Sequence, residues 1–138
     1  MQTSMSEPHF LYVEDDLMSR KVLEVLLMKV MGFSQVTIFE NSDRFMERLH
    51  QLPMPPSLFL LDIQMRPHNG YEVLEMLRKE PAYQKTPVIA LTANVMAHDV
   101  EQLQSVGFNG LIGKPIMKEL FPDIIQRIIS GESVWYIP

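Results

Sequence analysis

Four short apolar segments of this 138-residue chain are each followed by side chains that could take part in ligand binding or catalysis. These side chains are three carboxylates, a hydroxyl and an ammonium group: Glu14, Asp15, Asp62, Thr92 and Lys114. Clustered carboxylates repel one another unless a cation joins them, and their oxygens suit Mg²⁺. A hydroxyl and an ammonium group suit the oxygens of a phosphoryl group. The set predicts a site for a divalent cation and a phosphoryl group, provided that the fold brings these side chains together.

The apolar segments that precede these side chains are typical of strands. Each is short, unbroken and bounded by turn residues, which suits a strand buried on both faces. The predicted strands are His9–Val13, Gln35–Phe39, Leu58–Leu61, Val88–Leu91 and Gly110–Gly113. Between them, apolar residues recur at helical spacing. The predicted helices are Leu17–Met31, a helix containing Phe45 to Leu49, Gly70–Lys79, Asn94–Val106 and Leu120–Ser130.

Local residue types predict how several helices begin and end. The apolar residues of the first helix lie at roughly helical spacing: Leu17, Val22, Val25, Leu26 and Met28. Gly32 is a suitable C-cap for this helix. A polar residue within 41–43 is expected to cap the second helix. Pro122 fits the last helix only in its first turn.

The alternation of strands and helices predicts an α/β domain with a parallel sheet and helices on both faces. The carboxyl ends of parallel strands lie at one edge of the sheet, where ligands bind, so the reactive side chains are expected together. We expect an N-terminal extension over residues 1–8, one domain over residues 9–130 and a C-terminal tail over residues 131–138. Trp135 and Tyr136 in the tail either fold back on the domain or contact a partner.

Each candidate residue also has an ordinary structural explanation. Asp62 could cap a turn or the next helix, and Glu14 to Asp16 could begin the first helix, where acids interact favourably with the helix dipole. Thr92 could hydrogen-bond its own backbone, and Lys114 could be a solvated surface lysine. Capping accounts for Asp16, but it explains neither Asp62 nor Lys114. The combination of residue types therefore favours a chemical role.

The composition restricts the class of protein. The chain has no cysteine, which excludes disulfides and thiolate metal sites. Its net charge of -5 argues weakly against direct binding of nucleic acid, because such binding depends on neutralising phosphates. No apolar run is long enough to span a bilayer, and residues 1–8 lack the apolar core of a signal peptide. We expect a cytoplasmic protein that does not insert into membranes.

From about Phe10 to Ser130 the chain resembles the receiver domain of bacterial response regulators. The motifs that carry the resemblance are Val13-Glu14-Asp15, Leu61-Asp62-Ile63-Gln64-Met65, Ala90-Leu91-Thr92-Ala93 and Lys114-Pro115. Each motif is weak alone, but their order, spacing and placement at strand ends are specific together. The resemblance implies a flavodoxin-like, doubly wound (βα)5 fold with a five-stranded parallel sheet in the strand order 2-1-3-4-5.

The resemblance also implies a phosphoacceptor and a metal site. Asp62 would accept a phosphoryl group, and Asp15 and Asp62 would bind Mg²⁺ directly. Glu14 would act largely through water, and the backbone carbonyl of Gln64 would complete the protein ligands.

Two further residues would contact the phosphoryl group. By the same resemblance, Thr92 would hydrogen-bond the phosphoryl oxygens and Lys114 would pair with them. The Lys114–Pro115 peptide bond would be cis.

The chain departs from the family pattern at two positions. The family usually has proline four residues after the phosphorylated aspartate, where this chain has Arg66 followed by Pro67. It usually has an aromatic residue three positions before the lysine, where this chain has Leu111. Because leucine has no ring to swing, we expect the loop over residues 93–96 to carry the main change on phosphorylation.

The expected function is that of a response regulator in two-component signal transduction. A histidine kinase or histidine phosphotransfer protein would donate the phosphoryl group in a Mg²⁺-dependent reaction. A downstream protein of unknown identity would bind the phosphorylated form or receive the phosphoryl group in a relay. We expect no enzymatic activity beyond autocatalysis of the domain's own phosphorylation and dephosphorylation.

Two other functions are compatible with parts of the pattern. One is a Mg²⁺-dependent phosphatase or phosphotransferase that works through an aspartyl-phosphate, although Gln64 stands where such enzymes commonly carry a second carboxylate. The other is an inert pseudo-receiver that serves only as a scaffold. The intact acids, together with Thr92 and Lys114, argue against it.

Overall fold

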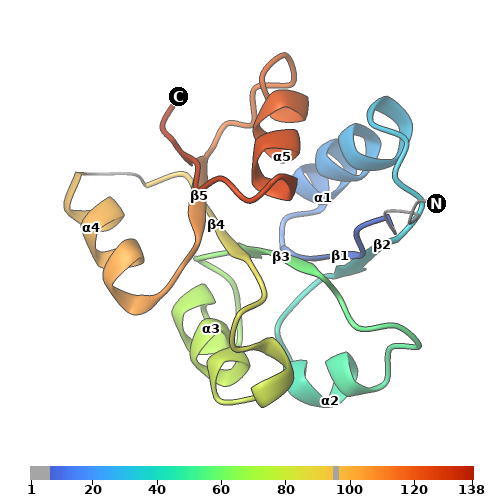
Figure 1. Ribbon diagram of the computed structural model, residues 1–138, viewed down its shortest axis with the longest axis vertical. Helices are drawn as coiled ribbons and strands as arrows, with labels where there is room; N and C mark the ends of the chain where they lie inside the picture. Colours follow the sequence, from blue (N-terminus) through green and yellow to red (C-terminus); the bar gives the residue numbers. More distant parts are fainter. Residues whose placement is uncertain (1–6, 95–96) are drawn as a thin grey trace.

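A parallel sheet forms the middle layer of the protein, with helices on both faces (Figure 1). The computed structural model describes residues 7–94 and 97–138, in which the sheet has six strands in the order β2-β1-β3-β4-β5-β6. The strands are β1 (Phe10–Val13), β2 (Val36–Phe39), β3 (Leu58–Asp62), β4 (Val88–Thr92), β5 (Gly110–Gly113) and β6 (Trp135–Tyr136). Neighbouring strands are parallel throughout. The predicted α/β fold and the order of the first five strands are confirmed.

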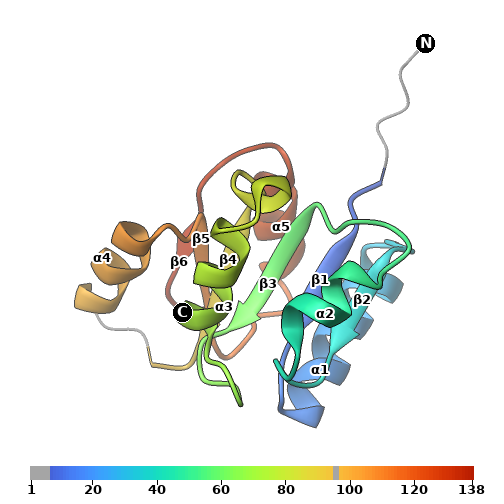
Figure 2. The same ribbon diagram turned by 90° about the horizontal axis from the view of Figure 1, so that it is seen from below.

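The sixth strand corrects the prediction of a five-stranded sheet. β6 lies beside β5 (Figure 2), and the N–H of Leu111 donates a 2.8 Å hydrogen bond to the carbonyl oxygen of Val134. The edge of β5 offers unpaired backbone groups, and tryptophan and tyrosine favour extended structure, so the tail pairs there. Gly110 permits this approach, because a Cβ atom at that position would lie 2.8 Å from the carbonyl oxygen of Val134.

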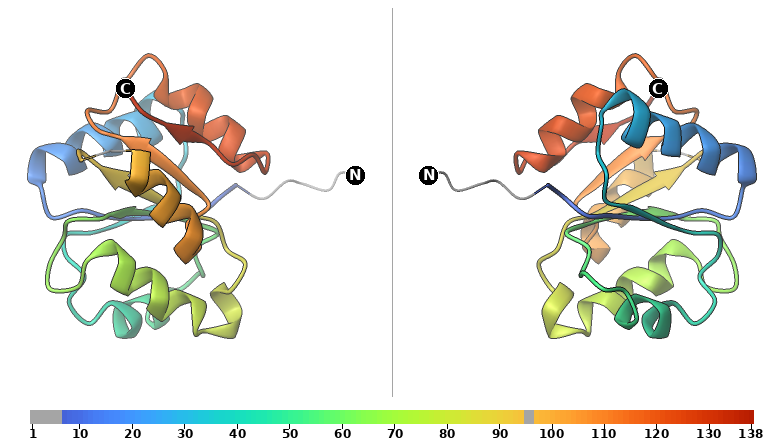
Figure 3. Two further views of the ribbon diagram at one scale, coloured as in Figure 1. Left: turned by 90° about the vertical axis from the view of Figure 1, so that its left-hand side faces the viewer. Right: turned by 90° about the vertical axis from the view of Figure 1, so that its right-hand side faces the viewer.

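The helices form the two outer layers. They are α1 (Leu17–Glu24) with a π-helical continuation over Val25–Val30, α2 (Phe45–His50), α3 (Gly70–Arg78), a 3₁₀ turn at Pro81–Tyr83, α4 (Ala97–Val106) and α5 (Phe121–Ile129). α1 and α5 lie on one face of the sheet, and α2 and α3 lie on the other (Figure 3). Leu103 of α4 belongs to the same buried cluster as side chains of α2 and α3. Among residues 7–94 and 97–138, no helix has the length and apolar composition that a membrane span requires.

α1 and its continuation bury only one, Leu26, of the five apolar residues noted at helical spacing in the sequence. The buried residues are Leu23, Leu26 and Leu27. Four members of the predicted set are more than one third exposed: Leu17, Val22, Val25 and Met28. Because apolar residues occur on both sides of this helix, spacing alone could not identify the buried side. Gly32 follows the helix with a φ of +80°, the left-handed conformation of a glycine C-cap, as predicted.

Ser42 connects the loop before α2 to the turn after β3. The predicted side-chain cap from residues 41–43 is wrong, because Arg44, in the left-handed conformation, precedes α2 and no side chain caps the helix. The buried hydroxyl of Ser42 instead donates a 2.6 Å hydrogen bond to the carbonyl oxygen of His68 and accepts a 2.8 Å bond from the N–H of His68. These bonds fix the turn that follows β3.

The start of α3 supports the same turn from the other side. Asn69 and Glu72 form a capping box, in which each side chain accepts a 2.9 Å hydrogen bond from the backbone N–H of the other residue. Gly70 follows directly, and a Cβ atom there would lie 3.0 Å from the carbonyl oxygen of Asp62. Glycine therefore allows α3 to begin close behind the end of β3.

Candidate functional site

The carboxyl ends of four strands bring the candidate residues to one edge of the sheet. In the parallel register, Asp62 at the end of β3 lies opposite Leu91, and Thr92 at the end of β4 lies opposite Gly113. Glu14 and Asp15 directly follow β1, and Lys114 directly follows β5. The prediction that parallel strands would assemble these side chains is confirmed.

Three of these residues form a carboxylate cluster. Glu14, Asp15 and Asp62 each contribute an oxygen atom, and the three oxygens lie within 4.8 Å of one another. Glu14 and Asp62 are buried, whereas Asp15 is exposed, so the cluster opens to solvent on one side. Hard oxygen donors at this spacing fit Mg²⁺, which binds through one or two carboxylates and keeps several waters.

Lys114 lies between the two buried carboxylates. Its Nζ donates a 2.8 Å hydrogen bond to Oε1 of Glu14 and lies 3.6 Å from Oδ1 of Asp62. The Lys114 side chain is 18% exposed, which excludes a solvated surface lysine. A single ammonium group thus balances part of the charge of three carboxylates.

Glu14 is fully buried and has several other hydrogen-bond partners. Oε1 also accepts a 3.1 Å bond from the hydroxyl of Tyr12, and Oε2 accepts a 3.2 Å bond from the N–H of Asp16. The backbone carbonyl of Glu14 accepts a 2.9 Å bond from Nη1 of Arg20. Asp16 in turn accepts a hydrogen bond from the N–H of Ser19 and caps α1, as predicted.

Burial and the neighbouring charges raise the pKa of two groups at the site, Asp62 and Tyr12. Burial raises the pKa of Asp62, and the hydrogen bond and charge of Glu14 raise it further, while Lys114 and the N–H of Gln64 act in the opposite direction. Burial and the charge of Glu14 also raise the pKa of Tyr12, so its hydroxyl stays a donor at neutral pH. A cation at the cluster would favour the ionised form of Asp62.

Thr92 and Gln64 border the site on the α3 side of the sheet. Both line a cavity of about 220 Å³. The hydroxyl oxygen of Thr92 accepts a 3.1 Å bond from the N–H of Asn94, and the N–H of Gln64 donates a 3.2 Å bond to Oδ1 of Asp62. Among residues 7–94 and 97–138, the Thr92 hydroxyl forms this one hydrogen bond, as an acceptor. The part of the predicted responsive loop formed by Val95 and Met96 lies outside the described residues.

Arg66 and Leu111, the two positions at which the chain departs from the family pattern, and the Lys114–Pro115 bond all lie within the described residues. Arg66 is exposed, and its peptide bond to Pro67 is cis. The Lys114–Pro115 bond is cis, as predicted. Leu111 is fully buried in the core cluster on the α2 and α3 side.

Sequence reasoning missed two residues that hold Glu14 in place, namely Tyr12 and Arg20. The period of two along a strand puts residues 12 and 14 on the same face, which was a usable signal for Tyr12. Arg20 gave no such signal, because its bond to a backbone carbonyl depends on how α1 packs on the sheet.

Comparison with known proteins identifies related chains. Residues 10–126 match the response regulator receiver domain family. The signal transduction histidine-protein kinase BarA of Escherichia coli K12 is 31% identical over 122 residues, which cover 88% of this chain and 13% of that protein. The chain therefore spans a small part of this curated relative.

Solved structures of receiver domains and response regulators are also similar to this chain. The crystal structure of the receiver domain of a sensor histidine kinase from Pseudomonas aeruginosa is 25% identical, has a TM-score of 0.76, and covers 91% of this chain and 100% of that chain. That structure is described with a magnesium ion coordinated in its active-site cleft. The chemotaxis response regulator CheY4 of Vibrio cholerae is 20% identical with a TM-score of 0.78 over 89% of this chain and 99% of that chain, and it shares the fold.

Proposed function

Because the chain belongs to the response regulator receiver family, we propose that it accepts a phosphoryl group on Asp62 in a two-component or phosphorelay pathway. The observation that supports this most directly is the position of the Asp62 carboxylate, which ends a central strand 3.6 Å from the ammonium group of Lys114. Asp62 also lies within a cluster of acids that could hold a cation. A nucleophile, a counter-charge for the phosphoryl oxygens and a metal site thus occur together.

The chemical step is a transfer from a phosphohistidine donor to the carboxylate. An oxygen of Asp62 forms a bond to phosphorus while the bond between phosphorus and the donor nitrogen breaks, and the electron pair of that bond leaves with the nitrogen. Negative charge gathers on the phosphoryl oxygens in the transition state. Lys114 would pair with these oxygens, and the hydroxyl of Thr92 would donate a hydrogen bond to one of them.

The residues that would hold Mg²⁺ are Asp15, Asp62, the backbone carbonyl of Gln64 and, through water, Glu14. The mutual proximity of the three carboxylates supports this ligand set, as does the magnesium ion of the Pseudomonas aeruginosa receiver domain. When bound, Mg²⁺ would neutralise the carboxylates and the phosphoryl oxygens together.

The partners follow from this chemistry. The phosphoryl donor would be a histidine kinase or a histidine phosphotransfer protein, since relatives of this chain are parts of histidine kinases. Output would come from a downstream protein that recognises the phosphorylated form or takes the phosphoryl group onward. We place this reaction in the cytoplasm, without direct contact to nucleic acid and without catalysis beyond the domain's own phosphorylation and dephosphorylation.

Intact-mass measurement after incubation with acetyl phosphate and Mg²⁺ tests the proposal. The unmodified protein should gain one phosphoryl group, and Asp62→Asn should gain none. Asp123→Asn is the matched control, because Asp123 is an exposed carboxylate in the first turn of α5. An adduct that persists in Asp62→Asn, or that never forms in the unmodified protein, would contradict the proposal. Turnover of a small phosphate ester would instead support a phosphatase.

A further inference from the structure

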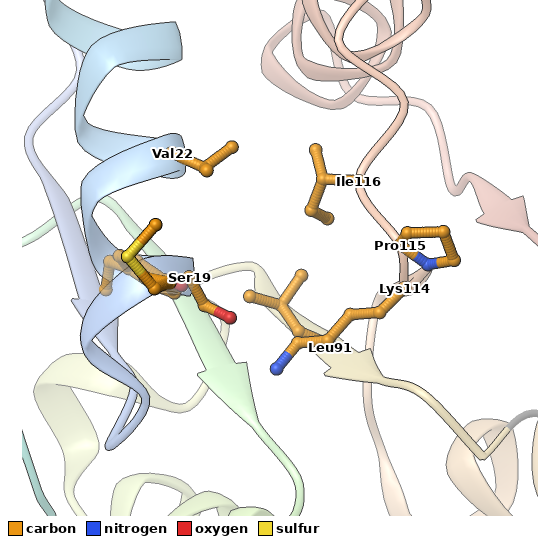
Figure 4. A pocket seen from close by; sticks show the side chains of 8 residues that line it. Ser19, Val22, Leu91, Lys114, Pro115 and Ile116 are labelled. Atoms are coloured by element: carbon orange, nitrogen blue, oxygen red, sulfur yellow. The ribbon is translucent and has the colours of Figure 1, made fainter.

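Tyr12 contributes to the site a hydroxyl group that donates a hydrogen bond to Glu14. It lies two residues before Glu14, so both side chains project from the same face of the sheet. The Tyr12 side chain is 1% exposed and lines a cavity of about 280 Å³ between α1 and the segment after β5. Figure 4 shows Lys114 reaching across this cavity toward α1, beside Leu91. Tyr12 and Lys114 therefore border the same cavity and meet at Glu14.

The two donors share one oxygen atom. Oε1 of Glu14 lies 2.8 Å from Nζ of Lys114 and 3.1 Å from the hydroxyl of Tyr12. Nζ of Lys114 also lies 3.6 Å from Oδ1 of Asp62. A phosphoryl group on Asp62 would therefore compete with Glu14 for the ammonium group.

Loss of Lys114 would remove one donor from a buried carboxylate. Glu14 is 0% exposed, and a buried carboxylate oxygen without a donor is strongly destabilised. Oε2 keeps the N–H of Asp16, whereas among the described residues Oε1 accepts hydrogen bonds from Lys114 and Tyr12. Tyr12 is thus the donor that stays on Oε1 when Lys114 turns away.

We propose that Tyr12 is a positioning residue that keeps Oε1 of Glu14 hydrogen-bonded while Lys114 turns toward the phosphoryl group on Asp62. This inference rests on the proposed function and extends it to a residue that touches neither the phosphoryl group nor the nucleophile. By supplying the second donor, Tyr12 reduces the free energy needed for Lys114 to leave Glu14. Its effect should therefore appear when the phosphoryl group is transferred, and it should be small when Mg²⁺ binds alone.

The test compares Tyr12→Phe with a control that loses the same atom elsewhere. Tyr83→Phe suits this purpose, because Tyr83 is also buried but packs against Phe59 in the core cluster on the opposite face of the sheet. The rate of phosphorylation by acetyl phosphate at saturating Mg²⁺ is followed by intact mass, and the Kd for Mg²⁺ is measured by calorimetry. Circular dichroism establishes that each variant is folded, since phenylalanine keeps the aromatic ring.

We expect Tyr12→Phe to slow phosphorylation about tenfold, the effect of leaving a buried charged acceptor without a partner. Its Kd for Mg²⁺ should equal that of the unmodified protein, and Tyr83→Phe should behave like the unmodified protein in both measurements. A double-mutant cycle then separates an action through Glu14 from a change in packing. In the Glu14→Gln background, Tyr12→Phe should cause little further loss of rate, because a neutral amide depends less on a second donor.

Three results would overturn the inference. Equal rates for the unmodified protein and Tyr12→Phe would do so, as would the same fold loss in the Glu14 and Glu14→Gln backgrounds. A matching loss in Tyr83→Phe would assign the effect to the core in general. All three results are compatible with phosphorylation of Asp62. If the unmodified protein formed no adduct at all, the proposed function would be overturned together with this inference.

Discussion

Replacing Asp62 by asparagine should stabilise the protein in the absence of a divalent cation. Asp62 is 5% exposed, and burial together with the hydrogen bond and charge of Glu14 raises its pKa from 3.8 to about 7. Each pKa unit corresponds to about 1.36 kcal/mol, so the ionised carboxylate destabilises the folded state by at most roughly 4 kcal/mol. Because Glu14 shares this perturbation and the site can rearrange, we expect Asp62→Asn to raise the free energy of unfolding by about 2 kcal/mol.

The destabilisation of the folded state by ionised Asp62 should decrease as the pH falls. The pKa of Asp62 is higher in the folded state, so the folded protein binds this proton more tightly than the unfolded chain. The cost of the ionised group is therefore full above about pH 8, decreases as the pH falls below the folded pKa, and disappears below about pH 3, where both states are protonated. The stability difference between Asp62→Asn and the unmodified protein should shrink over the same interval.

Urea unfolding in the presence of a chelator measures this difference. Trp135 is the single tryptophan and lies in β6, so its fluorescence reports on the sheet, and far-ultraviolet circular dichroism tests whether the helices unfold with it. Asp123→Asn serves as the control for removal of an exposed charge. If Asp62→Asn is no more stable than the unmodified protein at about pH 8 without metal, burial and the charge of Glu14 do not destabilise the ionised form of Asp62.

Three further changes have expected outcomes. Mg²⁺ at ten times its Kd should stabilise the unmodified protein by about 1.4 kcal/mol, and Asp15→Asn should raise metal-free stability while abolishing this effect in melting curves. Gly110→Ala should destabilise the protein by about 1–3 kcal/mol and change the tryptophan fluorescence, because its Cβ atom would meet the carbonyl oxygen of Val134. Beryllofluoride with Mg²⁺ should shift the backbone amide signal of Asn94 in NMR spectra, because drawing the hydroxyl of Thr92 toward a phosphate mimic disturbs the bond between them. Large shifts confined to α5, with Asn94 unchanged, would indicate another route.

The assembly of the site was predictable because it depends on a simple property of parallel sheets. Four of the five predicted strands ended on a reactive side chain, and parallel strands bring their carboxyl ends to one edge. Asp62 and Lys114 could therefore be placed together without knowledge of any contact. The alternative explanation as a helix cap was correct for Asp16, whose side chain caps α1.

Features that depend on packing were not predictable in the same way. β6 has only the two residues Trp135 and Tyr136, too few for a periodic pattern, and it forms because β5 leaves an edge free. The sequence did not identify the buried face of α1, since apolar side chains such as Val22 also lie on its exposed side. Ser42 resembles a helix cap in the sequence, but its hydroxyl bonds the turn after β3, a contact between segments far apart in the chain.

The most direct test of the central claim is to locate the phosphoryl group. The protein is incubated with acetyl phosphate and Mg²⁺, the acyl phosphate is reduced with borohydride, which converts a phosphorylated aspartate to homoserine, and peptides are sequenced by mass spectrometry. Homoserine should occur at position 62 and at no other aspartate, and omission of Mg²⁺ should prevent it. Homoserine at Asp15 or another position, or its absence from every peptide, would contradict the account.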